Sequence, residues 1–336
     1  MPPVRPGAGA VTLHDVAAAA GVSLMTASRA LRTPEVVSAA TREKVMQAVA
    51  QTGYIPNLLA GGLKSRRSMT VAALVPVISV PQFLPTIQVL TEQLDRAGYQ
   101  VLLGQTGYDH AREEALLNTM IGRRVDGIVV AGLLQHGDTA RRLARLGVPV
   151  VETWDMTERP LDTVVGFSHV QVGAAVAGHF MARGWTRVGL ATGGDQRAGQ
   201  RRAGFLSVIG KDVPTAVTEV PAGVPHGRRA LSTLLAQAPD LRAVFCSSDG
   251  MAEGVLTEAL ARGLRVPEDL AVIGFGGAEF SAFLHPSLST VHIDGAEIGR
   301  RAADVLIARG RGEASGPAIV DIGFQLVLRG STGDAA

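Results

Sequence analysis

The segment from Leu24 to Arg29 carries side chains of the types that contact DNA. The hydroxyls of Thr26 and Ser28 can bond phosphate oxygens, and Arg29 can pair with a guanine edge or a phosphate. Leu24 or Met25 can contact a thymine methyl group. The first 68 residues hold eight Lys and Arg against three Asp and Glu, whereas the rest of the chain holds 24 and 27. This asymmetry favours a polyanionic partner for the basic head, with a solvated basic surface as the alternative.

Three short helices must position these side chains. Thr12 is a natural N-cap for a helix through residues 16–20, and Ser23 can cap a second helix over residues 24–31. The apolar spacing predicts a third helix over residues 39–52. Helices this short cannot bury a face alone, so they must pack together as a helix-turn-helix unit, whose second helix enters the major groove of DNA. An ordinary helical hairpin with a polar surface is the alternative.

Sequence motifs follow one another almost without gaps over this region. They are Val11-Thr-Leu-His-Asp-Val-Ala17, Ala20-Gly-Val-Ser23, Ala27-Ser-Arg-Ala-Leu31, Val37-Ser38, Thr41-Arg-Glu-Lys-Val45 and Gly53-Tyr-Ile-Pro-Asn57. Together they resemble the DNA-binding headpiece of the LacI–GalR family of repressors. The resemblance implies that residues 57–64 form a hinge that folds on operator DNA and inserts Leu63 into the minor groove, where an apolar wedge kinks the duplex. The predicted DNA-binding set is Thr12, Ser23, Leu24, Met25, Thr26, Ser28, Arg29, Ser38, Asn57 and Leu63.

From Thr70 onward, apolar strands alternate with helices. The predicted strands cover residues 71–75, 99–103, 126–130, 148–151, 187–191, 243–246 and 271–274. Because parallel strands need crossover helices, this alternation predicts an α/β body of doubly wound parallel sheets, in two lobes that face a cleft. Ligands bind outside the carboxyl ends of such strands. The candidates at these ends are Pro76, Gln105, Glu152, Asp155, Thr192, Ser248, Asp249 and Gly276.

The body carries motifs of its own. They are Asp126-Gly-Ile-Val-Val130, Gly147-Val-Pro-Val-Val151, Arg201-Arg-Ala-Gly-Phe205, Ala243-Val-Phe-Cys-Ser-Ser-Asp249 and the segment from Pro267 to Phe275. These resemble the effector-binding core of the same family, which has the fold of periplasmic sugar-binding proteins. The resemblance implies three chain crossings between lobes, near Phe167, His292 and Asp321. We therefore expect a flexible N-terminus (1–10), a helix-turn-helix domain (11–56), a hinge (57–69) and an effector-binding and dimerisation core (70–333), with an N-lobe of about 70–166 and 294–320 and a C-lobe of about 167–292 and 321–333.

Further motifs resemble the gluconate-operon repressors within that family. They are Gly98-Tyr-Gln100, Gly107-Tyr108, Val150-Val-Glu152 with Asp155, Val165-Gly-Phe167 and Asp321-Ile-Gly-Phe324. A sugar acid such as gluconate or phosphogluconate is the effector that this resemblance implies. Arg201 offers a bidentate fork for a carboxylate, although an ion pair within its lobe is the alternative, and Glu152 and Asp249 can accept from hydroxyls. The predicted effector set is Pro76, Phe83, Gln105, Glu152, Asp155, Arg201, Ser248, Asp249 and Gly276.

Composition and missing motifs exclude other classes. With 46% hydrophobic and 18% charged residues, the chain is globular, and its longest apolar run, residues 71–81, contains two prolines and is too short to span a membrane. The single Cys246 and the absence of a signal segment favour a cytoplasmic protein.

Residues 166–170 lack the closing glycine of a nucleophile elbow, and a scattered histidine such as His169 is more typical of a structural or surface role. We expect no enzyme, cofactor or metal, but a homodimeric repressor on a pseudo-palindromic operator. A neutral-sugar effector, a corepressor or a sugar-binding protein that does not bind DNA are the alternatives.

Overall fold

The computed structural model describes residues 11–55, 67–134, 138–313 and 318–333. The chain divides into two compact units, Met1–Ser68 and Met69–Ala336. The N-terminal segment 1–10 and the predicted DNA contacts Asn57 and Leu63 lie outside the described residues.

The small unit is built from short helices. Within residues 11–55 they are α1 (Leu13–Ala20), α2 (Leu24–Arg32) and α3 (Ala39–Thr52), with a 3-10 turn at Pro34–Val36. Val16, Ala30, Val45 and Ala48 form the buried centre, so each α-helix contributes at least one small or branched apolar side chain. Because these side chains are short, the helices approach closely enough to bury a shared core, which confirms the predicted helical headpiece.

Within the described residues, the large unit contains two six-stranded sheets. The first has the order β2-β1-β3-β4-β5-β11, with every neighbouring pair parallel. Its strands are β1 (Thr70–Val75), β2 (Gln100–Gln105), β3 (Gly127–Ala131), β4 (Val150–Thr153), β5 (Thr163–Gly166) and β11 (Ala318–Asp321). The second has the order β7-β6-β8-β9-β10-β12, parallel except for the pair β10 and β12. Its strands are β6 (Val188–Gly193), β7 (Thr215–Thr218), β8 (Ala243–Cys246), β9 (Ala271–Gly276), β10 (Ser289–His292) and β12 (Gln325–Val327).

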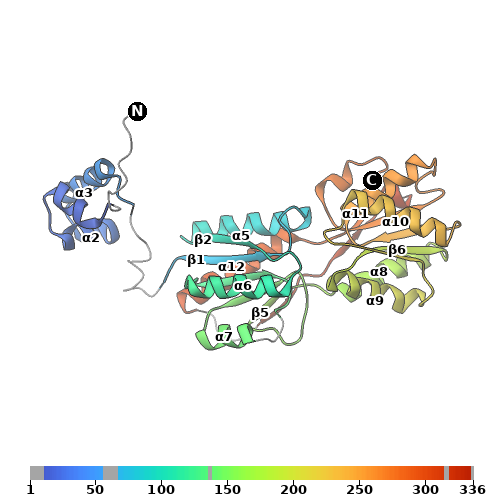
Figure 1. Cartoon of the computed structure of the whole chain (residues 1–336), viewed down its shortest axis with the longest axis horizontal. Helices are drawn as coiled ribbons and strands as arrows, with labels where there is room; N and C mark the ends of the chain where they lie inside the picture. The colour runs from blue at the N-terminus through green and yellow to red at the C-terminus, as the bar shows by residue number, and fades with distance from the viewer. Residues whose placement is uncertain (1–10, 56–66, 135–137, 314–317, 334–336) are drawn as a thin grey trace. The chain divides into compact units, whose positions relative to one another are not determined.

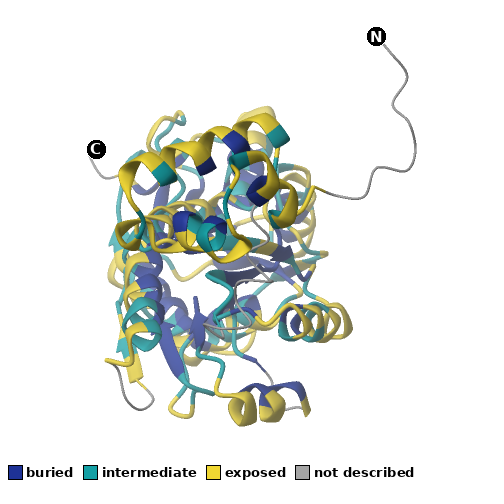
Figure 2. Cartoon of the chain, turned by 90° about the vertical axis from the view of Figure 1, so that its left-hand side faces the viewer, coloured by how far each residue is buried: buried dark blue, intermediate teal, exposed yellow. Residues whose placement is uncertain are grey.

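Helices cover both faces of each sheet (Figure 1). Around the first sheet they are α5 (Leu84–Arg96) and α12 (Gly295–Arg311), which pack together, and α6 (His110–Gly122) and α7 (Asp138–Leu146), which pack together on the other face. Around the second sheet the pairs are α8 (His169–Ala182) with α9 (Gln196–Ile209) and α10 (Val224–Gln237) with α11 (Asp249–Ala261). Buried residues concentrate on the strands and exposed ones on the outer helix faces (Figure 2). This arrangement confirms the predicted fold class.

We call the first sheet with its four helices the N-lobe and the second the C-lobe. We expected crossings near Phe167, His292 and Asp321. In the described part of the chain, crossings follow β5, which ends at Gly166, β10, which ends at His292, and β11, which ends at Asp321. No helix in the described ranges is long and apolar enough to cross a membrane.

Candidate functional site

Helix α2 presents the predicted base-contacting residues to solvent. The exposed fractions of Leu24 and Met25 are 39% and 61%, and Arg29 is also exposed. Ala27 and Ala30 are buried on the opposite side of the helix. Small residues therefore pack α2 against the rest of the headpiece, and its larger side chains stay exposed to another molecule.

Three other predicted DNA contacts stand at helix N-termini. The Ser23 hydroxyl accepts from the Thr26 N–H at 3.1 Å, and the Ser38 hydroxyl accepts from the Thr41 N–H at 3.3 Å. Thr12 precedes α1 and donates its N–H to Asp15 at 2.7 Å. Helix N-termini attract phosphate groups because the helix dipole is positive there and first-turn N–H groups have no partner within the helix, so these positions suit contacts to a DNA backbone.

A cleft lies between the N-lobe and the C-lobe. Three adjoining cavities among the described residues belong to it, with volumes of about 40, 300 and 210 Å³. Tyr108 and Arg197 line both the first and the second, and Gln82 and Ser248 line both the first and the third. The three spaces therefore adjoin one another and have walls from both lobes.

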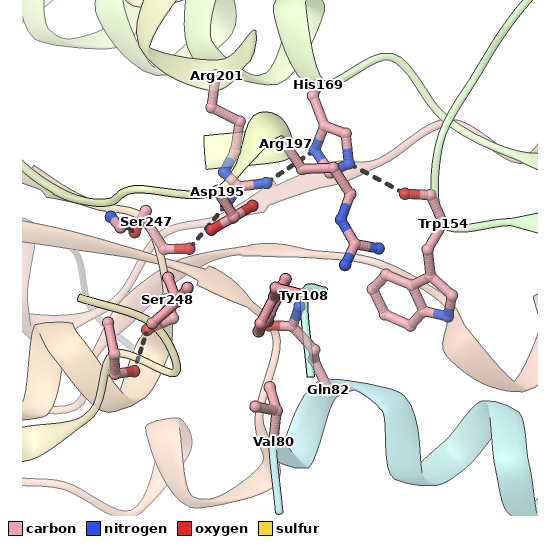
Figure 3. Close-up of a pocket in the computed structure, with 13 residues that line it drawn as sticks. Val80, Gln82, Tyr108, Trp154, His169, Asp195, Arg197, Arg201, Ser247 and Ser248 are labelled. Carbon is pink, nitrogen blue, oxygen red and sulfur yellow. Dashed lines mark hydrogen bonds between the residues drawn. The ribbon is translucent and has the colours of Figure 1, made fainter. Parts of the chain in front are cut away.

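Arg201 carries a buried charge into this cleft (Figure 3). Only 5% of the residue is exposed, and its guanidinium carbon lies 3.9 Å from the centre of the Phe275 ring. It donates from Nη1 to His169 Nδ1 at 2.8 Å and from Nη2 to the Ser247 carbonyl at 3.0 Å. Its Nε is buried without a hydrogen-bond partner, and no described carboxylate forms an ion pair with it. Burial lowers the pKa of Arg201 to about 10, because water no longer stabilises the cation.

His169 is held in one protonation state by its neighbours. An arginine can only donate, so Nδ1 must accept and the ring proton must sit on Nε2. That nitrogen donates to the Trp154 carbonyl at 3.0 Å. Burial, followed by the charges of Arg201 and Arg197, holds the pKa of His169 well below its usual value of 6.5. The imidazole is therefore neutral.

A second cation, Arg197, reaches from α9 of the C-lobe to the N-lobe. Its guanidinium donates to the Ala131 carbonyl at 3.4 Å and lies 5.5 Å from the centre of the Phe83 ring. Figure 3 shows it extending toward the space between Trp154 and Tyr108. Two guanidinium groups thus face a cleft whose walls also carry the carboxyl groups of Asp155 and Asp195, and they offer an anion a direct contact.

Two predicted acids are already occupied by protein donors. Asp249 accepts from the Thr290 hydroxyl and from the Ala278 N–H, both at 2.6 Å, and burial raises its pKa to about 6. Glu152 accepts from the N–H groups of Leu134 at 2.8 Å and Leu161 at 2.9 Å. Their carboxylates stabilise backbone turns and strand ends, although Asp249 also lines the third cavity.

The structure separates the predicted effector residues into two groups. The cleft is lined by Pro76, Asp155, Arg201, Ser248, Asp249 and Gly276. Phe83, Gln105 and Glu152 line none of these three cavities. Phe83 is only 1% exposed because it packs against Trp154, with ring centres 5.1 Å apart. Gln105 accepts from the Ile78 N–H at 3.3 Å.

Several lining residues were absent from the predicted set. They are Gln82, Tyr108, Trp154, His169, Asp195 and Arg197. His169 follows β5, a four-residue strand that we did not predict, so it was not recognised as a strand-end residue. Asp195 and Arg197 belong to the start of α9, which we did not predict either. Asp195 accepts from the Ala198 N–H at 3.0 Å, an N-cap pattern that the sequence does contain.

Comparisons with known proteins agree with this architecture. Residues 12–57 match the lacI family of bacterial regulatory proteins, and residues 177–332 match a periplasmic binding protein-like domain. The HTH-type transcriptional regulator GntR of Pseudomonas aeruginosa is 35% identical over 330 residues, 96% of each chain.

Solved structures show the same likeness. A LacI family transcriptional regulator from Silicibacter pomeroyi has a TM-score of 0.88 and 32% identity, over 96% of this chain and 99% of that one. The lac repressor dimer bound to operator and the anti-inducer ONPF has a TM-score of 0.82 and 25% identity, over 96% and 99%. The chain therefore belongs to the lacI family of bacterial regulatory proteins and is a DNA-binding transcriptional regulator, not an enzyme.

Proposed function

We propose that this regulator binds a pseudo-palindromic operator as a homodimer, and that a sugar acid bound between the lobes controls its operator affinity. The observation that carries the effector class is Arg201, a buried cation in the cleft with an unpartnered Nε and no ion pair in the described residues. A buried charge without an ion pair is costly, although the carboxylates of Asp195 and Asp155 act on it from beyond ion-pair distance. An anionic ligand that bonds it directly therefore gains more than it would at a solvated arginine.

The rest of the cleft suits a polyhydroxylated chain attached to that acid. Asp155 lines the 300 Å³ cavity together with Tyr108 and Arg197, and burial raises the pKa of its carboxyl. Such groups can donate to or accept from hydroxyls. Gluconate, which the sequence resemblance implies, has one carboxylate and a chain of hydroxyls, and this distribution matches the polarity of the cleft.

Operator binding follows from the headpiece surface. A dimer places two α2 helices on two half-sites, and one repressor of similar structure is an operator-bound dimer. An effector that binds better to a core state incompatible with operator binding shifts the population by its differential affinity alone. We propose that the sugar acid acts in this way and releases the DNA.

Fluorescence anisotropy on a labelled promoter fragment tests both parts at one fixed salt concentration. We expect tight binding that millimolar gluconate weakens. Tight binding that responds only to 6-phosphogluconate, or only to a neutral sugar, would change the effector class. Binding that a ligand strengthens would indicate a corepressor. No preference over random DNA would contradict operator recognition.

A matched pair of arginines tests the reading helix. Arg29→Ala is expected to cost about tenfold or more in operator affinity and to relax base preference, because Arg29 is an exposed residue of the helix that enters the groove. Arg32→Ala removes the same charge from the last turn of α2 and is the control. Equal losses would indicate nonspecific attraction only. A Leu63→Ser variant with unchanged operator affinity would contradict the hinge wedge.

A further inference from the structure

His169 is the only side chain to which Arg201 donates among the hydrogen bonds of the described residues, and it is uncharged. The ring lies between Arg201 and the Trp154 carbonyl (Figure 3). It packs against Phe167, with ring centres 4.6 Å apart, and only 3% of the residue is exposed. The imidazole thus fixes the guanidinium in place and brings no negative charge to it. The nearby carboxylates of Asp195 and Asp155 act on that charge without forming an ion pair with it in the described residues.

The N-lobe in turn holds His169 in place. Trp154 has a left-handed backbone with φ of +62°, which is uncommon for a large side chain. Its indole N–H donates to the Thr86 hydroxyl at 3.0 Å, and that hydroxyl donates to the Gly295 carbonyl at 2.7 Å. Trp154, whose carbonyl accepts the hydrogen bond from His169, is therefore anchored to α5 and to the start of α12. Both helices belong to the N-lobe, whereas His169 begins α8 of the C-lobe.

The chemistry of this position depends on which acceptor stands there. A carboxylate within hydrogen-bond distance of Arg201 would form a buried ion pair and compensate its charge. A neutral acceptor supplies the same hydrogen bond without doing so. An arginine whose hydrogen-bond partners are all neutral keeps more of its attraction for an anionic ligand than an arginine in an ion pair does.

We propose that His169 is a positioning residue that makes the cleft select a carboxylate over an uncharged sugar, because it orients the Arg201 guanidinium without neutralising it. This inference rests on the proposed function, in which Arg201 receives the acid group of the effector. It adds a residue that determines specificity without touching the effector, because it acts only by orienting Arg201.

Two variants, His169→Asn and His169→Asp, test this proposal in the full chain, and their new side chains have nearly the same shape as each other. Asn and Asp both place an oxygen close to the position of His169 Nδ1 and differ from each other in charge. Isothermal titration measures the affinity for gluconate and for gluconamide, which has the same carbon chain without the charge. We expect the wild type to prefer gluconate by about 100-fold, which is the strength of a charge-assisted contact. His169→Asn should keep this preference within about fivefold, whereas His169→Asp should lose most of it.

The outcomes separate the two proposals. If Asn and Asp lose the preference equally, or both keep it, the inference is wrong while the effector class stands. If the wild type binds both compounds equally, the sugar-acid function itself is wrong, and the inference falls with it.

A measurement without ligand checks the protonation state on which the inference depends. The ¹⁵N shifts of the His169 ring, assigned by their loss in His169→Asn, should show Nε2 protonated and Nδ1 unprotonated at neutral pH. An imidazolium or the opposite tautomer would overturn the role of His169 whatever the effector. Thermal unfolding of both variants verifies that each one folds.

Discussion

Two cavities of the cleft bury opposite charges in different ways: the third, which we call the aspartate end, and the first, which we call the arginine end. At one end, the carboxylate of Asp249 accepts from Thr290 and from the Ala278 N–H. At the other end, Arg201 leaves its Nε unpartnered and has only neutral acceptors among its hydrogen-bond partners. Both residues are almost fully buried, and both line the cleft.

The difference teaches that burial alone does not identify a ligand-binding charge. A buried group with all its partners within the protein stabilises the fold, and removing it leaves those partners unpaired. A buried group with an unpaired hydrogen-bond donor costs stability, so a ligand that accepts from this donor binds tightly. On this criterion, the Arg201 guanidinium serves effector binding, and the Asp249 carboxylate chiefly stabilises the fold.

The largest expected effect is on affinity at the arginine end. Arg201→Met should weaken gluconate binding by about 100-fold, or about 3 kcal/mol, because a charge-assisted contact is lost. The free energy of unfolding should change little, because a buried cation is removed while His169 Nδ1 and the Ser247 carbonyl lose their donor. Calorimetric titration and urea unfolding measure the two quantities.

Arg202→Met, at the exposed next position of α9, is the control and should change neither quantity. If Arg201→Met binds gluconate normally and unfolds more easily, the guanidinium is a structural group and the comparison between the two ends fails.

The converse is expected at the aspartate end. Asp249→Ala should lower the free energy of unfolding by about 2 kcal/mol, because the Thr290 hydroxyl and the Ala278 N–H lose their acceptor. Gluconate affinity should fall by less than about tenfold, because both oxygens of the Asp249 carboxylate already accept from protein donors. Asp304→Ala, on an exposed position of α12, is the control. A stable variant with a large loss of affinity would show that Asp249 serves the ligand.

The pH dependence of stability should have opposite signs at the two ends. Below pH 6.5, the unfolded chain protonates His169 whereas the native imidazole stays neutral, so the unfolding free energy due to this group falls as pH falls, by up to about 1.4 kcal/mol per pH unit. Asp249 has its pKa raised from 3.8 to about 6, so the native state holds the extra proton. Its contribution rises as pH falls from about 6 to about 4.

Urea unfolding across this range, for the wild type and for His169→Asn and Asp249→Asn, isolates each contribution by difference. Difference curves that slope in the same direction for both variants would contradict the assigned protonation states.

The smallest effect concerns the close approach of the lobes at Gly276. This residue has φ of +124°, and a Cβ there would lie 2.9 Å from Gln82 Oε1 of the opposite lobe. Gly276→Ala should lower the unfolding free energy by about 1–2 kcal/mol. Gly210→Ala is a matched control, since its φ is +113° and a Cβ would meet nothing within 4 Å. If the two variants lose equal stability, the contact between lobes adds nothing to the backbone strain.

Much of this architecture is determined by local sequence. The apolar run before Pro76 forms β1, and the alternation of such runs with helices produces the two parallel sheets. Thr12, Ser23 and Ser38 stand at the helix starts where their side-chain chemistry places them. These features depend on neighbours within a few positions, so periodicity and capping patterns are enough to predict them.

Tertiary structure alone decided which charges are open to a ligand. Arg201 and Glu152 look alike in the sequence as charged residues placed to contact an effector. Folding brings Leu134 and Leu161 to the Glu152 carboxylate, and it brings the neutral ring of His169 to Arg201. These partners lie between 9 and 32 positions away, and they meet only because folding brings separate segments of the chain together. The availability of a buried charge depends on distances between such segments, and no local pattern of residue types encodes those distances.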